Sequence, residues 1–68
     1  MSIASISEIK ASSKVSFDDA IKQGVRRATS TLRNVKSAWV QNQDVSIDEN
    51  GEITEYRVQL KVTFILED

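Results

Sequence analysis

The sequence predicts a small α+β domain of order β-α-β-β, in which one helix covers a three-stranded antiparallel sheet. Three observations support this class. Apolar residues recur at steps of three and four over residues 17–33, mostly apolar and polar positions alternate over residues 54–66, and Asn50-Gly51 separates two strand-like segments. The chain of 68 residues has no internal repeat or linker, so we expect a single domain over residues 1–68.

The helix is expected over residues 17–33. Ser16 with Asp19 three residues later makes a variant of the capping box, and acidic residues suit the positive end of the helix dipole. Arg33 is expected in the last turn, and Asn34 in the left-handed conformation that ends a helix. One face carries small and apolar residues: Phe17, Ala20, Ile21, Gly24, Val25, Ala28 and Leu32.

A β-hairpin is expected in the C-terminal half. Along residues 54–66 the even-numbered positions are mostly apolar and face the core. Asn50-Gly51 favours a two-residue type I′ turn, which needs positive φ at both positions. Residues 35–48 then form the preceding strand. The implied register pairs Val45 with Tyr56 and Ile47 with Thr54.

Within this preceding strand the aliphatic residues switch from odd positions near the turn to even positions further back, where Ala38 and Val40 are the aliphatic pair. A β-bulge near residues 42–44 would keep aliphatic side chains on the core face throughout. With that bulge, the side chains of Ser37, Trp39 and Arg57 lie on the sheet face away from the helix. Without it, Trp39 is a core residue.

A third strand is expected at about residues 3–10, because Ile3, Ile6 and Ile9 need shelter. One helix covers only one face of such a sheet, and a chain this short builds a small core. We therefore expect self-association.

The composition excludes much chemistry. The chain has no cysteine, histidine or proline, hence no thiolate nucleophile, imidazole base, disulfide or ordinary zinc site. No paired constellation suggests that Tyr56 or a carboxylate acts as acid or base, so we do not expect an enzyme. No apolar run is long enough for a membrane span, and residues 1–10 do not resemble a signal peptide, which predicts a cytoplasmic location.

Charge is divided along the chain. Residues 10–36 contain seven basic and two acidic side chains, whereas residues 44–68 contain two basic and seven acidic ones. The two parts could pair within a subunit or between subunits, or the basic helix face could bind nucleic acid phosphates. Exposed helix cations are more often solvated or paired, so a nucleic-acid partner is the alternative interpretation.

Two segments resemble the dodecin family: residues 16–35, with SFDDAI, then Val25 with Arg27-Ala28, then TLRNV, and residues 51–66, GEITEYRVQLKVTFIL. Dodecins are small bacterial and archaeal β-α-β-β proteins whose sheet half-wraps the helix. The resemblance implies a hollow homo-dodecamer. It also implies storage of a flavin, FMN or riboflavin, between subunits, with the ring stacked on a tryptophan and hydrogen-bonded by a glutamine.

Both hallmark positions of the flavin site differ here. The position of the stacking tryptophan is Ser37, which has no π face, and the position of the glutamine is Arg57. The chain is therefore more similar to the dodecins that lack the flavin tryptophan. Trp39, two residues beyond Ser37, is either a displaced stacking platform or a residue packed in a subunit interface.

Arg27 matches a family arginine and is expected to form an intersubunit ion pair or to contact a phosphate, such as that of coenzyme A, which some dodecins bind. Arg57 would contact an anionic ligand or pair with an acidic neighbour, Glu55 or Asp44 of another subunit. The acidic residues from 48 to 55 could attract calcium, although their spacing is not a known loop motif. The sequence thus predicts a shell that binds a small cofactor of the flavin type, with a non-flavin dodecin binding coenzyme A or metal ions as the alternative.

Overall fold

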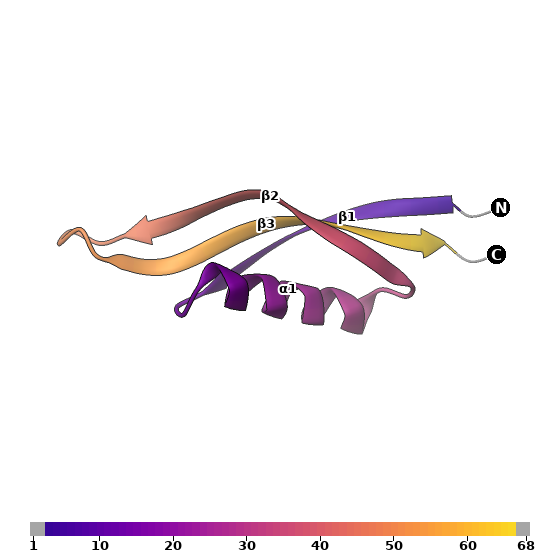
Figure 1. Cartoon of the computed structure of the whole chain (residues 1–68), viewed down its shortest axis with the longest axis horizontal. Helices are drawn as coiled ribbons and strands as arrows, with labels where there is room; N and C mark the ends of the chain where they lie inside the picture. Colours follow the sequence, from indigo (N-terminus) through magenta and orange to yellow (C-terminus); the bar gives the residue numbers. More distant parts are fainter. Residues whose placement is uncertain (1–2, 67–68) are drawn as a thin grey trace.

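The computed structural model describes residues 3–66, which form one twisted antiparallel sheet with a helix on one face (Figure 1). The elements, in chain order, are β1 (Ile3–Ser13), α1 (Phe17–Thr31), β2 (Val35–Ile47) and β3 (Ile53–Leu66). The strand order is β1-β3-β2, so β3 is central and pairs with both neighbours. The predicted β-α-β-β fold is confirmed, and the first strand is longer than expected.

The start of α1 agrees with the predicted cap. The hydroxyl of Ser16 accepts a hydrogen bond of 3.0 Å from the backbone N–H of Asp19. The helix ends at Thr31, so the expectation that Arg33 lies in its last turn is wrong. Hydroxyl side chains explain the early end, because Ser30 and Thr31 both donate to the carbonyl of Arg27 and weaken the helical continuation.

Beyond α1 the chain turns sharply. Leu32 is extended, and its N–H donates to the carbonyl of Ala28 over 2.8 Å. The extended backbone lets the Leu32 side chain pack against the core. Asn34 has φ 58°, the left-handed conformation expected from the sequence.

The core lies between α1 and the even-numbered side of β3. Its buried members are Ala20, Ala28, Val58, Leu60 and Val62. Small residues on α1 allow the helix to approach β3 closely: a Cβ added at Gly24 would lie 2.9 Å from Cδ1 of Leu60. The predicted core face of the last strand is therefore confirmed.

The hairpin turn differs from the prediction. Of Asn50 and Gly51, only Gly51 has positive φ, 82°, so the prediction of a type I′ turn at Asn50-Gly51 is wrong. Asp48 accepts from the N–H of Gly51 and donates its own N–H to Glu52, which makes a three-residue loop that ends in a glycine bulge. The Asp48 carboxylate also accepts from the N–H groups of Asn50 and Glu52, which favours this longer loop.

The register shows how far the hairpin prediction holds. Val45 pairs with Tyr56 as expected, but Ile47 pairs with Ile53 rather than Thr54 because of a register shift next to the turn. The predicted bulge in β2 exists, but it lies between Val40 and Asn42, slightly before the expected place. It places Ala38 and Val40 opposite the buried Val62 and Leu60.

The helix covers only part of the sheet. Both ends of the sheet extend past α1, and the hairpin end is the longer extension (Figure 1). The expected shelter is incomplete in one chain, because Ile3 and Ile6 are more than half exposed and only Ile9 packs against the core. Within residues 3–66, no helix is long and apolar enough to cross a membrane.

Candidate ligand-binding face

The sheet face away from α1, called the open face here, carries most of the side chains that the sequence marked as functional. Its central row is the odd-numbered side of β3, whose even-numbered side is buried under the helix. Cross-strand pairing extends this row on both sides. The row and its neighbours are Glu8, Lys10, Ser12, Ser37, Trp39, Asn42, Asp44, Arg57, Gln59 and Lys61.

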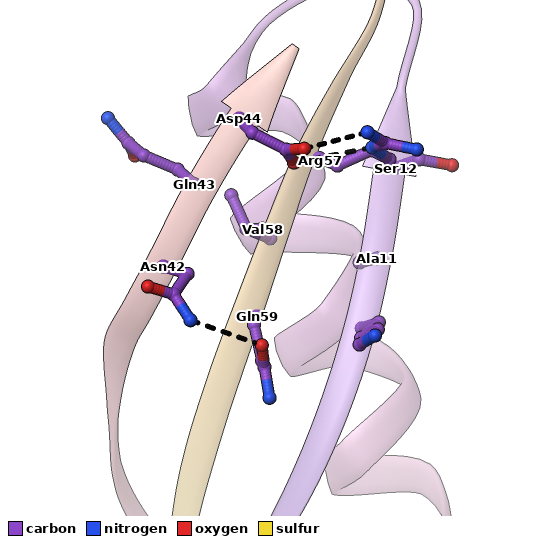
Figure 2. Close-up of a pocket in the computed structure, with 9 residues that line it drawn as sticks. Ala11, Ser12, Asn42, Gln43, Asp44, Arg57, Val58 and Gln59 are labelled. Carbon is purple, nitrogen blue, oxygen red and sulfur yellow. Dashed lines mark hydrogen bonds and ion pairs between the residues drawn. The ribbon is translucent and has the colours of Figure 1, made fainter. Parts of the chain in front are cut away.

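A hollow of about 630 Å³ lies on this part of the sheet and is lined from all three strands. Lys10 belongs to β1, Asn42 and Asp44 to β2, and Arg57 and Gln59 to β3. Figure 2 shows Asp44 and Arg57 pointing toward each other across two strands, and Asn42 pointing toward Gln59. The hollow is therefore polar and already lined by partnered side chains.

Trp39 lies on the open face, opposite Lys61 of β3. The bulge that follows Trp39 in β2 determines this side, as the bulged alternative predicted. Trp39 is 46% exposed, and Nζ of Lys61 lies 5.9 Å from the centroid of its indole ring. The ammonium favours the electron-rich ring face, so the two side chains hold each other in place.

A short chain of hydrogen bonds crosses the sheet beside this pair. Nδ2 of Asn42 donates to Oε1 of Gln59 over 3.3 Å, and Nε2 of Gln59 donates to Oε2 of Glu8 over 2.8 Å. Each amide keeps one further N–H, and its oxygen a further lone pair. A bound molecule could thus find both donors and acceptors here.

Arg57 forms a two-point contact with Asp44 of the same chain. Nη2 lies 2.7 Å from Oδ2, and Nε donates to Oδ1 over 3.3 Å. The Asp44 carboxylate raises the pKa of the Arg57 guanidinium above its ordinary value, first through this hydrogen bond and then through its charge. Asp44 was the expected kind of partner, but within the subunit; its two carboxylate oxygens engage one edge of the guanidinium.

The other two predicted site residues lie apart from this hollow. Ser37 is on the open face opposite Thr63, next along β2 from Trp39, and has no ring to stack on. Arg27 is exposed on α1, which packs against the other face of the sheet. The fold therefore brings Ser37, Trp39 and Arg57 to one face, and leaves Arg27 on the opposite side of the subunit.

Sequence reasoning missed the residues that connect Trp39 with Arg57. Gln59 and Lys61 were read as the polar side of an alternating strand, which they are. The signal available was their shared parity with Arg57. Asn42 needed the bulge position, and Glu8 needed the pairing of β1 with β3, in which it faces Lys61.

The acidic turn shows no built cation site in the single chain. The Asp48 carboxylate is engaged with the backbone of the loop. Across residues 3–66, no three or more acidic, histidine or cysteine side chains gather in a way that could hold a metal ion.

Comparison with known proteins identifies the family. The family model described as Dodecin matches residues 3–67. A curated relative, the calcium dodecin of Mycobacterium tuberculosis, is 34% identical over 64 residues, which covers 94% of this chain and 89% of that protein.

Solved structures agree over 96% or more of the chain. A dodecin from Thermus thermophilus carrying an arginine-to-alanine substitution superposes with a TM-score of 0.91 at 31% identity, covering 100% of both chains. A dodecin from Streptomyces davaonensis gives 0.90 at 28% identity, over 98% of this chain and 97% of that one. The crystal structure of the calcium-chelating dodecin from Mycobacterium tuberculosis gives 0.82 at 29% identity, over 96% and 91%. In sequence and in fold, the chain belongs to the dodecin family.

Proposed function

We propose that this protein assembles into a homo-dodecameric shell and sequesters a planar aromatic cofactor of the flavin type on its open face, with Trp39 as the stacking surface. Dodecins bind small ligands, and a binding role fits this chain better than catalysis. The mechanism is storage: the ligand is stacked and buried between subunits, and no covalent bond forms. A cytoplasmic location stays a prediction.

The observation that carries this proposal is the position of Trp39. It is a large aromatic side chain, 46% exposed on a polar sheet face rather than packed under the helix. An isoalloxazine ring stacked on it would remove the contacting face of each ring from water and gain an aromatic contact. The ammonium group of Lys61 lies near the indole and would attract an anionic ring or a phosphate of the ligand.

The amides next to Trp39 fit the edge of such a ring. Gln59 lies between Lys61 and Arg57 in the open-face row of β3. Because Trp39 pairs with Lys61, Gln59 is diagonally adjacent to Trp39. Its amide, together with that of Asn42, offers donors and acceptors to an imide edge. By resemblance, family flavin sites use a tryptophan and a glutamine, and Trp39 with Gln59 would supply both from new positions.

Ser37 and Arg57 have secondary parts in this proposal. Ser37 leaves space beside Trp39 where a larger side chain would stand. Arg57 lies at the far end of the hollow, held by Asp44, and would meet an anionic group of the ligand only through the N–H groups that Asp44 leaves unused.

Calcium is the second ligand to test, because a curated relative is a calcium dodecin. No acidic cluster within residues 3–66 of one chain favours it. Coenzyme A bound at Arg27 is the further alternative from the resemblance, and it would occupy the helix side rather than the open face.

The experiment is a titration of the purified protein with riboflavin and with FMN, followed by flavin fluorescence and by native mass spectrometry. We expect a dodecamer that quenches flavin fluorescence. In Trp39→Ala the flavin affinity should fall at least about tenfold, because stacking and aromatic burial both disappear. Trp39→Phe should keep part of the affinity.

Three controls separate the alternatives. Arg27→Ala should leave flavin affinity unchanged, whereas it would abolish binding of coenzyme A if that ligand uses the helix side. Calcium and coenzyme A are added alone in parallel. The proposed ligand site is contradicted if the dodecamer binds neither riboflavin nor FMN, or if Trp39→Ala leaves the flavin affinity unchanged. A monomeric protein contradicts the proposed assembly.

A further inference from the structure

The helix side of the sheet has a second, apolar hollow at its β2 edge. It measures about 310 Å³ and lies between the C-terminal half of α1 and the first half of β2. Six of its lining residues are Val25, Ala28, Thr29, Val35, Ala38 and Val40. It exists because α1 packs over β1 and β3 and barely reaches β2. Val40 is consequently 38% exposed although it faces the helix side.

Basic side chains border this hollow. Lys36 is part of its lining. Lys22 and Arg26 precede Val25 and Thr29 by three residues on α1, which places them beside these lining residues on the helix surface. None of these three cations forms an ion pair with another residue of the described range 3–66.

The opposite end of the molecule has the complementary character. The hairpin formed by the end of β2, the turn and the start of β3 extends past α1 (Figure 1). Its isoleucines are exposed, Ile47 by 62% and Ile53 by 50%. Between Val45 and Tyr56 the sequence has four carboxylates and no lysine or arginine. We call residues 45–56 the hairpin arm.

We propose that the hairpin arm of one copy docks into the apolar hollow beside α1 of a second copy, with its carboxylates against Lys22, Arg26 and Lys36. Both surfaces are apolar at the centre and charged at the border, with opposite signs. Burial of Ile47 and Ile53 removes apolar surface from water, and the charges orient the contact. The contact joins two different surfaces, so repetition of it closes a ring or shell instead of ending at a dimer.

This inference rests on the self-association in the proposed function, but not on the ligand. It specifies which residues the partner copy contributes, and so it can fail while the shell and its ligand site stand.

Disulfide trapping tests the contact, because the natural chain has no cysteine. We place one cysteine on the hairpin arm, Ile53→Cys, and one at the hollow, Thr29→Cys; both positions are exposed. Under mild oxidation, the chain with both cysteines should give a reducible ladder of dimers, trimers and larger species. The matched control pairs Ile53→Cys with Lys14→Cys, an exposed position in the loop between β1 and α1 that does not line the hollow, and should give no ladder.

The outcomes separate the two proposals. A ladder that needs both cysteines supports the docking contact. Dimers from Ile53→Cys alone mean that two arms meet each other, which overturns it. An assembled protein, verified by native mass spectrometry, without any ladder also overturns it and leaves the proposed shell intact. A monomeric parent protein overturns both.

Charge reversal gives an independent test with the natural surfaces. Glu52→Lys and Arg26→Glu, each alone, should weaken assembly by about threefold or more, measured as the protein concentration of half-dissociation, because like charges then face each other. The double variant Glu52→Lys with Arg26→Glu should recover most of this loss. Single variants that assemble as well as the parent, or a double variant that assembles no better than the weakened single variants, contradict the pairing of these surfaces.

Discussion

The two sides of β3 have opposite roles, although they alternate residue by residue along one strand. Val58, Leu60 and Val62 are almost completely buried under α1. The residues between them and before them, Arg57, Gln59 and Lys61, form contacts on the open face. Close packing determines what can stand on the first side, whereas hydrogen bonds and ion pairs determine the second. A strand can therefore stabilise the fold with one side and present a binding surface with the other.

The largest expected effect comes from truncation on the buried side. Leu60 is 1% exposed and contacts the closest approach of α1, so Leu60→Ala should lower the free energy of unfolding by about 2–5 kcal/mol. Lys61→Ala, one residue along on the open face, should cost less than about 1 kcal/mol. Urea denaturation at one fixed protein concentration measures both. Equal losses at the two positions would break the comparison.

The next effect concerns the same buried side from the helix. In Gly24→Ala, the new Cβ would stand 2.9 Å from Cδ1 of Leu60 and 3.3 Å from Cβ of Ala11. Overpacking of about 1–3 kcal/mol should exceed the gain in helix propensity of about 1 kcal/mol, so the variant should be less stable.

A second substitution sharpens this test. Leu60→Val shortens the side chain that meets the new Cβ, so the cost of Gly24→Ala should be smaller in that background. If Gly24→Ala stabilises the protein in both backgrounds, as judged by urea denaturation, the close approach of α1 to β3 does not limit packing.

The smallest effect concerns a polar contact within the otherwise apolar helix side. Ser13 is the buried polar residue among those described, and its hydroxyl donates to Oδ2 of Asp19 over 2.6 Å. Gln23 donates to the same oxygen. These two hydrogen bonds, the one from Ser13 first, lower the pKa of Asp19 below its ordinary value of 3.8.

The sign of the pH effect follows from this direction. A carboxyl whose pKa is lower in the folded state stabilises the fold above its unfolded pKa and loses that contribution as the pH falls through the folded value. Asp19→Asn should therefore reduce the loss of Tm on acidification below about pH 4. Asp18→Asn is the matched control, because Asp18 is exposed and makes no side-chain hydrogen bond within residues 3–66. If Tm falls with pH in the same way in the parent protein, Asp19→Asn and Asp18→Asn, the role of Asp19 is contradicted.

Several features could be predicted because their causes are local. The cap at Ser16, the apolar face of α1 and the alternation of β3 each depend on neighbours within a few residues. If β2 contains a bulge that keeps Ala38 and Val40 near the core, Trp39 must lie on the sheet face away from the helix. The residues of the open face could be predicted once it was known which positions of β2 and β3 face the core.

Other features depended on competition for backbone groups or on contacts between distant segments. The early end of α1, the loop at Asp48 and the position of the bulge were each displaced from the expectation by one or two residues. At the end of α1 and in the loop, hydroxyl and carboxylate side chains bind backbone groups, and such competition leaves little trace in periodicity. The position of the bulge depends on the pairing of β2 with β3. The link of Gln59 to Glu8 spans 51 residues along the chain, so no local pattern could have indicated it.

Composition and periodicity were enough to predict the class of fold, the buried sides of α1 and β3, and the lack of cysteine and histidine chemistry. The likeness to dodecins came from the matching segments at residues 16–35 and 51–66. Three features depend on how the elements pack in three dimensions: the set of side chains that meet on the open face, the contact of Arg57 with Asp44 of its own chain, and the apolar hollow beside β2. The physical reason is register: a shift of one residue in strand pairing moves a side chain to the other face, and the shift is determined by packing across the whole sheet.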